Sequence, residues 1–167
     1  MADIVLLEAN PVFKSRTGKN IDFALLNHGG IRSIISKGSV SARTAYEVMP
    51  FENSIVVVEL SGKSVLEMVH FLIGSKRPHP FAGMQIVLNS KDKLASLKIQ
   101  GEIFDLNKNY FVATSNYLVT GGDNMQFFTK KISVTETDYL IRNAMIDYFK
   151  KVDTLKAIVD DRFYKLN

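Results

Sequence analysis

The segment from Asn27 to Arg32 (NHGGIR) contains the residue types best suited to hold a small polar ligand. Two consecutive glycines, Gly29 and Gly30, let the backbone turn sharply or let a ligand approach with no Cβ in the way. Arg32 offers a rigid fork of N–H donors that suits a carboxylate or a phosphate. Asn27 can both donate and accept, as a base edge or a sugar hydroxyl requires. The same glycines also fit a plain turn, since glycine is the default turn residue.

Two aromatic side chains lie in other polar loops of the sequence. Phe51 follows a proline in the loop 50–53, and Tyr117 lies in the glycine-containing loop 116–123. Aromatic faces stack with nucleic-acid bases at about 1–3 kcal/mol per base, so two rings on separate loops could hold a flat ring between them. The alternative is that both are core residues, the usual position of aromatic side chains.

The loop 116–123 ends in Gly121, Gly122 and Asp123. An aspartate carboxylate could accept hydrogen bonds from a pair of ribose hydroxyls, while Arg32 could hold an anion through charge-assisted hydrogen bonds. Together with the two aromatic residues, these groups favour a nucleoside or nucleotide pocket.

Each of the three loops adjoins a segment typical of a buried strand, because apolar and β-branched residues run without interruption between turn residues. These predicted strands are Asp22–Leu26, Ser54–Leu60 and Tyr110–Thr114.

The remaining elements are predicted from periodicity and capping residues. Ser41 is a possible N-cap, Thr137 or Asp138 caps the last helix, and Pro11 makes continuation of the first helix doubtful. The tail Leu155–Leu166 is amphipathic and fits a helix or an extended segment. The predicted helices are 2–10, 41–48, 63–73 and about 137–151, and further strands are 84–88, 94–99, 102–104 and about 132–134. Consecutive strands without helical crossovers indicate an α+β fold with a mixed sheet.

Composition fits one globular domain: the chain has 167 residues, of which 46% are hydrophobic and 23% charged. The formal net charge is +4, and no block of Lys and Arg argues for nucleic acid as a partner. The chain has no cysteine, which excludes disulfides and thiolate metal sites. No apolar run is long enough for a membrane segment, and no signal peptide is visible.

Four motifs occur in a characteristic order: N-x-G-G-I-R, P-F-x-N, V-V-V-E-L-S-G and Y-x-V-A-T-S-N-Y-L-x-x-G-G-D. In this order they resemble the C-terminal domain of the 5′-nucleotidase family, which includes bacterial UDP-sugar hydrolases, bifunctional cyclic-nucleotide phosphodiesterases and animal ecto-5′-nucleotidases. The resemblance runs from near Ala2 to about Phe128, and more loosely to the C-terminus. It implies a layered α/β/β/α domain with mixed β-sheets.

The resemblance also implies which residues bind substrate. They are Asn27, Gly29, Gly30, Arg32, Phe51, Asn53, Tyr117, Gly121, Gly122 and Asp123. Phe51 and Tyr117 would stack on the two faces of the base, with Tyr117 standing where the family usually has a second phenylalanine. Asp123 would bind the ribose hydroxyls, and Arg32 would lie near the sugar and phosphate. The two asparagines would contact the base or another part of the substrate, and the glycines would shape the loops.

The family enzymes carry an N-terminal metallophosphoesterase domain with two metal ions and a catalytic His–Asp pair, and nothing in this sequence resembles it. The three histidines, His28, His70 and His79, lack ligand spacing such as H-x-x-x-H or D-x-H. We expect residues 1–167 to form a single 5′-nucleotidase C-terminal-like domain, truncated at its N-terminus, with no catalytic residue, metal ligand or cofactor of its own. Divalent metals are expected only on the missing metallophosphoesterase domain.

The leading hypothesis is therefore a substrate-recognition domain of a 5′-nucleotidase-type hydrolase, inactive as the isolated chain. It would present a nucleotide's phosphate to a dimetal site on another domain or on a separate protein. The alternative is a stand-alone nucleoside-binding or interaction protein with no hydrolytic role. The resemblance implies a periplasmic or extracellular location.

Overall fold

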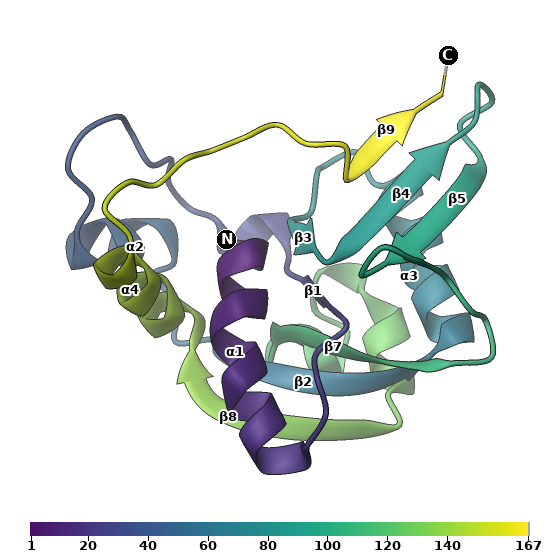
Figure 1. The fold of residues 1–167 in the computed structure, drawn as a ribbon, viewed down its shortest axis with the longest axis horizontal. Helices are drawn as coiled ribbons and strands as arrows, with labels where there is room; N and C mark the ends of the chain where they lie inside the picture. The colour runs from purple at the N-terminus through teal and green to yellow at the C-terminus, as the bar shows by residue number, and fades with distance from the viewer. Residues whose placement is uncertain (167) are drawn as a thin grey trace.

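The computed structural model describes residues 1–166 and contains four α-helices and nine β-strands among them (Figure 1). The helices are α1 (Ala2–Thr17), α2 (Ala42–Val48), α3 (Gly62–Gly74) and α4 (Ile141–Lys151). The strands are β1 (Phe23–Leu25), β2 (Ser54–Ser61), β3 (Phe81–Ala82), β4 (Met84–Leu88), β5 (Leu94–Ile99), β6 (Glu102–Ile103), β7 (Asn109–Ser115), β8 (Ser133–Leu140) and β9 (Phe163–Lys165).

The strands form two mixed sheets. The five-stranded sheet has the order β3-β1-β7-β2-β8, and the four-stranded sheet has the order β6-β5-β4-β9. In the first sheet β1 is parallel to β7, whereas every other pair of neighbours is antiparallel. In the second sheet only β4 and β9 are parallel. The predicted α+β class with mixed sheets is confirmed.

Two cores flank the five-stranded sheet, because its strands alternate apolar side chains between two buried faces. Ala24, Ile55 and Val57 belong to the core formed with α1, α2 and α4. Phe23 and Val58 belong to the core formed with α3 and the four-stranded sheet. Figure 1 shows α1 and α4 together on one side of the long strands, and β4 and β5 with α3 on the other.

The first helix extends past Pro11, so the prediction that it ends near Asn10 is wrong. α1 runs to Thr17 with the proline inside it. Val5, Ala9 and Phe13 are buried on one face of this helix, whereas Pro11 is exposed to solvent. Packing of the buried face therefore outweighs the hydrogen bond that proline removes.

The segment around Thr137 and Asp138 is strand and not the start of a helix. β8 continues to Leu140, and α4 begins at Ile141. The hydroxyl of Thr137 donates to the Ile55 carbonyl at 2.5 Å, and Asp138 has a φ of 55°. The register between β2 and β8 shifts at this point, so these two residues form a β-bulge. Threonine and aspartate are also common helix N-cap residues, which is why the sequence predicted the start of a helix here.

The tail is extended, one of the two predicted forms: β9 pairs in parallel with β4.

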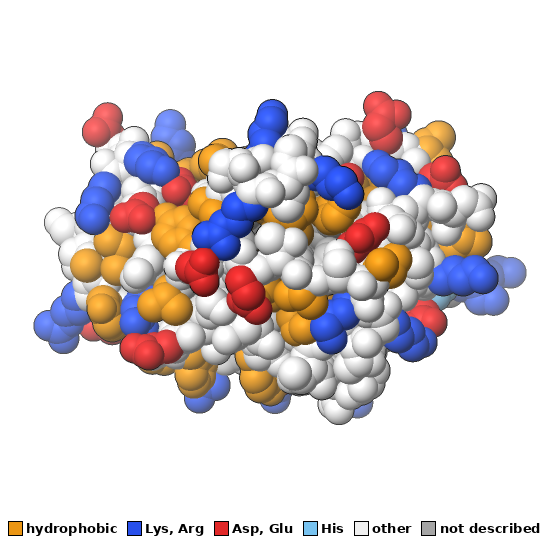
Figure 2. All heavy atoms as spheres, turned by 90° about the horizontal axis from the view of Figure 1, so that it is seen from below, with side chains coloured by type: hydrophobic (Ala, Val, Ile, Leu, Met, Phe, Trp, Pro, Cys, Tyr) orange, Lys and Arg blue, Asp and Glu red, His pale blue; other side chains and the backbone are white. Residues whose placement is uncertain are grey.

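On the face seen in Figure 2, basic, acidic and apolar side chains are interspersed. This face therefore carries no continuous basic surface of the kind that binds nucleic acid.

Candidate functional site

Strand direction brings the three predicted loops together. The β1 strand is parallel to β7, and β2 is antiparallel to β7. The end of β1, the end of β7 and the start of β2 must therefore lie at the same edge of the sheet. The loops 27–32, 50–53 and 116–123 leave or enter the sheet at these three points.

A cavity of about 320 Å³ lies between these loops. Its volume is within the range of small-molecule sites, roughly 300–1,000 Å³. Eight of the ten residues expected to bind substrate line it: Asn27, Gly29, Gly30, Arg32, Phe51, Asn53, Tyr117 and Asp123. Gly121 and Gly122 do not line the cavity and instead shape the loop behind it.

Asp123 is held from two sides. Its Oδ2 accepts from the side-chain amide of Asn27 at 2.6 Å, and its Oδ1 accepts from the Tyr117 hydroxyl at 3.1 Å. Each carboxylate oxygen has two lone pairs, so the group keeps acceptor capacity for a further donor. Its backbone has a φ of 52°, the left-handed region that aspartate tolerates better than most residues.

Glycine is required at Gly122 because a side chain there would occupy the space of Tyr117. A Cβ at this position would lie 2.7 Å from the Tyr117 ring and 2.7 Å from its carbonyl oxygen. At Gly29 a Cβ would lie 3.2 Å from both Asn27 Nδ2 and Asp123 Oδ2. Both glycines thus make room for the polar and aromatic side chains of the site.

Phe51 and Tyr117 are not core residues. Their exposed fractions are 41% and 47%, although large aromatic side chains are usually mostly buried. The Arg32 guanidinium lies 5.7 Å from the centre of the Phe51 ring, and its Nη1 donates to the Gly29 carbonyl at 3.3 Å. The cavity thus has two exposed aromatic rings and an exposed cation.

Arg142, which the sequence analysis did not single out, supports the loop that carries Phe51. It lies in the first turn of α4, only 5% exposed, and its Nη1 donates to the carbonyls of Pro50 and Phe51, each at 3.3 Å. An arginine within an amphipathic helix gives no sequence signal of such a role.

His79 supports the segment 27–30 from the other side. Its Nδ1 accepts from the backbone N–H of His28 at 3.2 Å, and its Nε2 lies 3.2 Å from the Ser75 hydroxyl. Burial lowers the pKa of His79, an effect that the nearby Asp123 carboxylate opposes and His28 reinforces.

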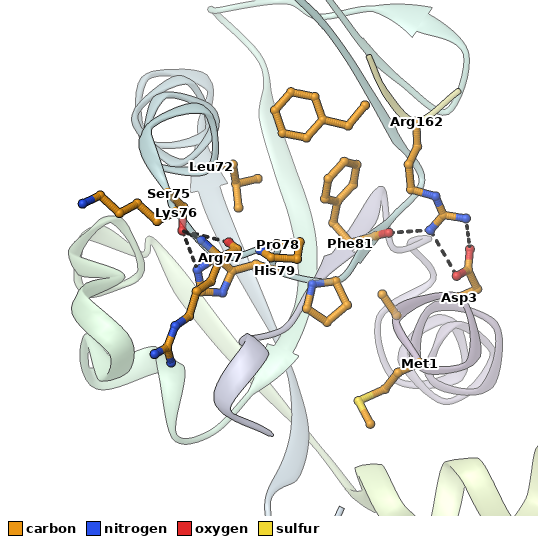
Figure 3. Close-up of a pocket in the computed structure, with 13 residues that line it drawn as sticks. Met1, Asp3, Leu72, Ser75, Lys76, Arg77, Pro78, His79, Phe81 and Arg162 are labelled. Carbon is orange, nitrogen blue, oxygen red and sulfur yellow. Dashed lines mark hydrogen bonds and ion pairs between the residues drawn. The ribbon is translucent and has the colours of Figure 1, made fainter. Parts of the chain in front are cut away.

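The same histidine lines a second cavity, of about 450 Å³, next to the start of α1 (Figure 3). Figure 3 shows the Ser75–His79 segment on one side of it, and Arg162 bound to Asp3 and the Phe81 carbonyl on the other. The 320 Å³ cavity, and not this one, contains the predicted residues.

Among residues 1–166, no three His, Asp or Glu side chains lie close enough to share a metal ion. The smaller cavity has one carboxylate, that of Asp123, so its residues do not fit a dimetal centre. No helix in the described part of the chain combines the length and apolar composition needed to cross a bilayer.

Residues 1–130 match the family model of the 5′-nucleotidase C-terminal domain. The chain belongs to this family. It is 34% identical over 149 residues to protein UshA of Escherichia coli, an alignment that covers 86% of this chain and 26% of UshA. A 5′-nucleotidase of Vibrio vulnificus is 25% identical over 134 residues, covering 78% of this chain and 24% of that protein. The chain thus spans about a quarter of the length of these curated relatives.

Solved structures support the same fold. A 5′-nucleotidase precursor from Thermus thermophilus superposes with a TM-score of 0.81 at 23% identity, covering 99% of this chain and 35% of that chain. The Haemophilus influenzae NAD nucleotidase superposes with a TM-score of 0.72 at 22% identity, covering 98% and 33%. At these identities the superpositions establish the 5′-nucleotidase C-terminal fold, as the resemblance predicted.

Proposed function

We propose that this chain recognises the nucleoside part of a nucleotide for a 5′-nucleotidase-type phosphoester hydrolase. The observation that carries the proposal is the cavity of about 320 Å³, in which two exposed aromatic rings, an aspartate and an arginine meet. Membership of the 5′-nucleotidase C-terminal domain family supports it. Relatives named 5′-nucleotidase and NAD nucleotidase support a nucleotide as the ligand.

In the proposed complex, Phe51 and Tyr117 stack on the two faces of the base, and Asp123 accepts from the ribose hydroxyls. The Asn27 amide and the Tyr117 hydroxyl fix the Asp123 carboxylate before a ligand arrives. Such preorganisation lowers the cost of ordering the site on binding. Arg32, whose guanidinium lies 5.7 Å from the centre of the Phe51 ring, would bind the phosphate at the rim of the cavity.

Hydrolysis requires a second component. A metallophosphoesterase domain, in a longer form of this protein or in a separate partner, would supply two divalent metals that activate the attacking water. This chain binds and orients the nucleoside so that the phosphate faces that centre. We propose that the complex acts outside the cytoplasm, in the periplasm or at the cell surface, as the resemblance to the 5′-nucleotidase family implies.

Calorimetric titration with adenosine and AMP tests the proposal. We expect this chain to bind both ligands, with affinity reduced about 5- to 160-fold by Phe51→Ala and by Tyr117→Ala, since each ring contributes about 1–3 kcal/mol. Tyr164→Ala, at a partly exposed position of β9 outside the cavity, serves as a surface aromatic control. Equal affinity in the chain and both variants, or no binding by any form, would rule out the base clamp.

Activity separates recognition from catalysis. We expect no AMP hydrolysis by this chain, even with added Mn²⁺ or Zn²⁺. Turnover that Phe51→Ala abolishes would contradict the assignment of the metals to another domain and place the reaction within this chain.

A further inference from the structure

We infer that Arg142 is a positioning residue for Phe51, and that α4 thereby forms part of the binding machinery. The inference rests on the proposed function, since it concerns the loop that presents Phe51 to the base. The family-model match ends at residue 130, so α4 lies beyond it.

The first two residues of α4 hold the loop 50–53 by its backbone. Arg142 Nη1 donates to the carbonyls of Pro50 and Phe51, and the backbone N–H of Ile141 donates to the Asn53 carbonyl at 3.0 Å. Three of the four carbonyls in this loop are therefore bound by α4. Because its backbone is fixed in this way, the loop loses less conformational entropy when Phe51 binds a base.

The Arg142 guanidinium is itself fixed. It lies 4.1 Å from the centre of the Tyr46 ring on α2, and its Nη2 is 3.7 Å from Glu52 Oε1. The Nε atom is buried and has no hydrogen-bond partner. The guanidinium thus leaves one donor unpaired while its Nη1 donates to the loop. Burying an arginine in this incomplete way costs stability, which points to a role beyond stability.

A lysine cannot substitute fully for this group. Its ammonium can donate to the two carbonyls, as Nη1 does, but it has no planar face to stack on the Tyr46 ring. We expect Arg142→Lys to retain the charge but to hold the loop less firmly, between the wild type and Arg142→Met.

The test uses a reporter that the sequence makes possible. The chain has no tryptophan, so Phe51→Trp introduces a single indole whose fluorescence anisotropy and acrylamide quenching report on this loop. We expect Arg142→Met to increase the local motion and the quenching of this indole. Tyr46→Ala, which removes an exposed ring beneath the guanidinium, keeps the fold and gives a smaller increase.

Arg16 provides the matched control. It also donates to two backbone carbonyls, those of Glu136 at 2.7 Å and Thr137 at 3.1 Å, but it joins α1 to β8 and does not line the cavity. We expect Arg16→Met to leave the indole signal unchanged. Equal motion of the indole with and without Arg142→Met, or the same increase with Arg16→Met, would overturn the inference.

A second arm measures adenosine affinity in the chain that keeps Phe51. We expect Arg142→Met to weaken binding roughly tenfold, since hydrogen bonds from a charged donor are lost, and Arg16→Met to leave it unchanged. A loosened loop with unchanged adenosine affinity would overturn the role in binding. If the unsubstituted chain itself binds no adenosine, the proposed function fails, and the indole signal alone decides whether Arg142 positions Phe51.

Discussion

The two ends of the β2–β7 pair use the same residue types for different purposes. The strands pair antiparallel from Ile55 opposite Ser115 to Ser61 opposite Asn109. A glycine, a tyrosine and an aspartate lie near each end. At the Ser61 end these are Gly62, Tyr110 and Asp105, and at the Ser115 end they are Gly122, Tyr117 and Asp123.

At the Ser61 end the polar groups satisfy one another. Tyr110 is 2% exposed, and its hydroxyl donates to the Asp105 carbonyl at 3.0 Å and accepts from the Asp105 N–H at 2.8 Å. The Asp105 side chain accepts from the N–H of Asn107 at 2.9 Å. The Tyr110 hydroxyl therefore has its donor and an acceptor position paired within the fold, and this end of the strand pair serves packing.

At the Ser115 end the side chains point outward. Tyr117 is 47% exposed, and its hydroxyl bonds a carboxylate side chain and not the backbone. The glycine makes room for a ring, whereas Gly62 makes room for a passing backbone. A glycine, tyrosine and aspartate therefore indicate a site only where the hydroxyl and the carboxylate can still form hydrogen bonds to a ligand in an adjacent cavity.

The largest effect on stability is expected from Gly62→Ala. A Cβ at Gly62 would lie 2.3 Å from the Leu106 carbonyl oxygen, and neither backbone can move without disturbing β7. Overpacking of this severity costs about 3 kcal/mol, or roughly 6–12 °C in Tm for a domain of this size. Thermal unfolding measures the loss. The adenosine affinity of the folded fraction should not change. A large drop in affinity would contradict the assignment of stability to the Ser61 end and of binding to the Ser115 end.

The same substitution at the opposite end, Gly122→Ala, should mainly affect binding. The added Cβ pushes against the Tyr117 ring and carbonyl, but the loop is at the surface and can shift. We expect adenosine affinity to fall roughly tenfold or more as the ring is displaced, with a stability loss of about 1 kcal/mol. Calorimetry and thermal unfolding on one preparation separate the two. A Tm loss as large as that of Gly62→Ala would contradict the comparison.

The site loops could be predicted because they depend on local signals, whereas the strand order that brings them together could not. Phe23–Leu25 and Ser54–Ser61 are apolar runs between turn residues, and the glycine pairs mark where chain direction changes. Motif order then implied the ten residues, eight of which line one cavity. That these residues bind a nucleoside stays a prediction.

The remaining features depend on tertiary contacts that the sequence does not encode locally. Pro11 is tolerated because the helix face opposite it is buried, and Thr137 bonds to a strand 82 residues away. Arg142 and His79 act on loops 91 and 51 residues distant. Neither has a motif, since any arginine in a helix or any histidine in a loop looks the same in sequence.

Asp123→Asn tests whether the carboxylate is what distinguishes the Ser115 end, which is open to the cavity, from the closed Ser61 end. The amide keeps the size of the group but removes its charge and one acceptor, and its NH₂ would face either the Asn27 amide or the Tyr117 hydroxyl. We expect adenosine to bind about tenfold more weakly. The difference in affinity between adenosine and 2′-deoxyadenosine should largely disappear. Asp105→Asn is the control at the closed end, and a preserved ribose preference in Asp123→Asn would remove this carboxylate from the site.

The smallest effect should appear as a pH dependence confined to the open end. Burial lowers the pKa of His79 below its ordinary value, despite the opposing charge of Asp123, so the folded chain keeps the imidazole neutral with Nδ1 as an acceptor for His28. The unfolded chain binds that proton already near pH 6.5. The free energy of unfolding should therefore decrease as pH falls from about 6.5 to the lowered pKa, and then level off.

Adenosine affinity should weaken over the same range, because a protonated Nδ1 cannot accept from the His28 N–H and so cannot support the segment that carries Asn27. His79→Gln should remove both slopes, whereas His70→Gln, at an exposed position of α3, should leave them intact. Identical pH profiles for the wild type and His79→Gln would show that the site does not depend on this imidazole.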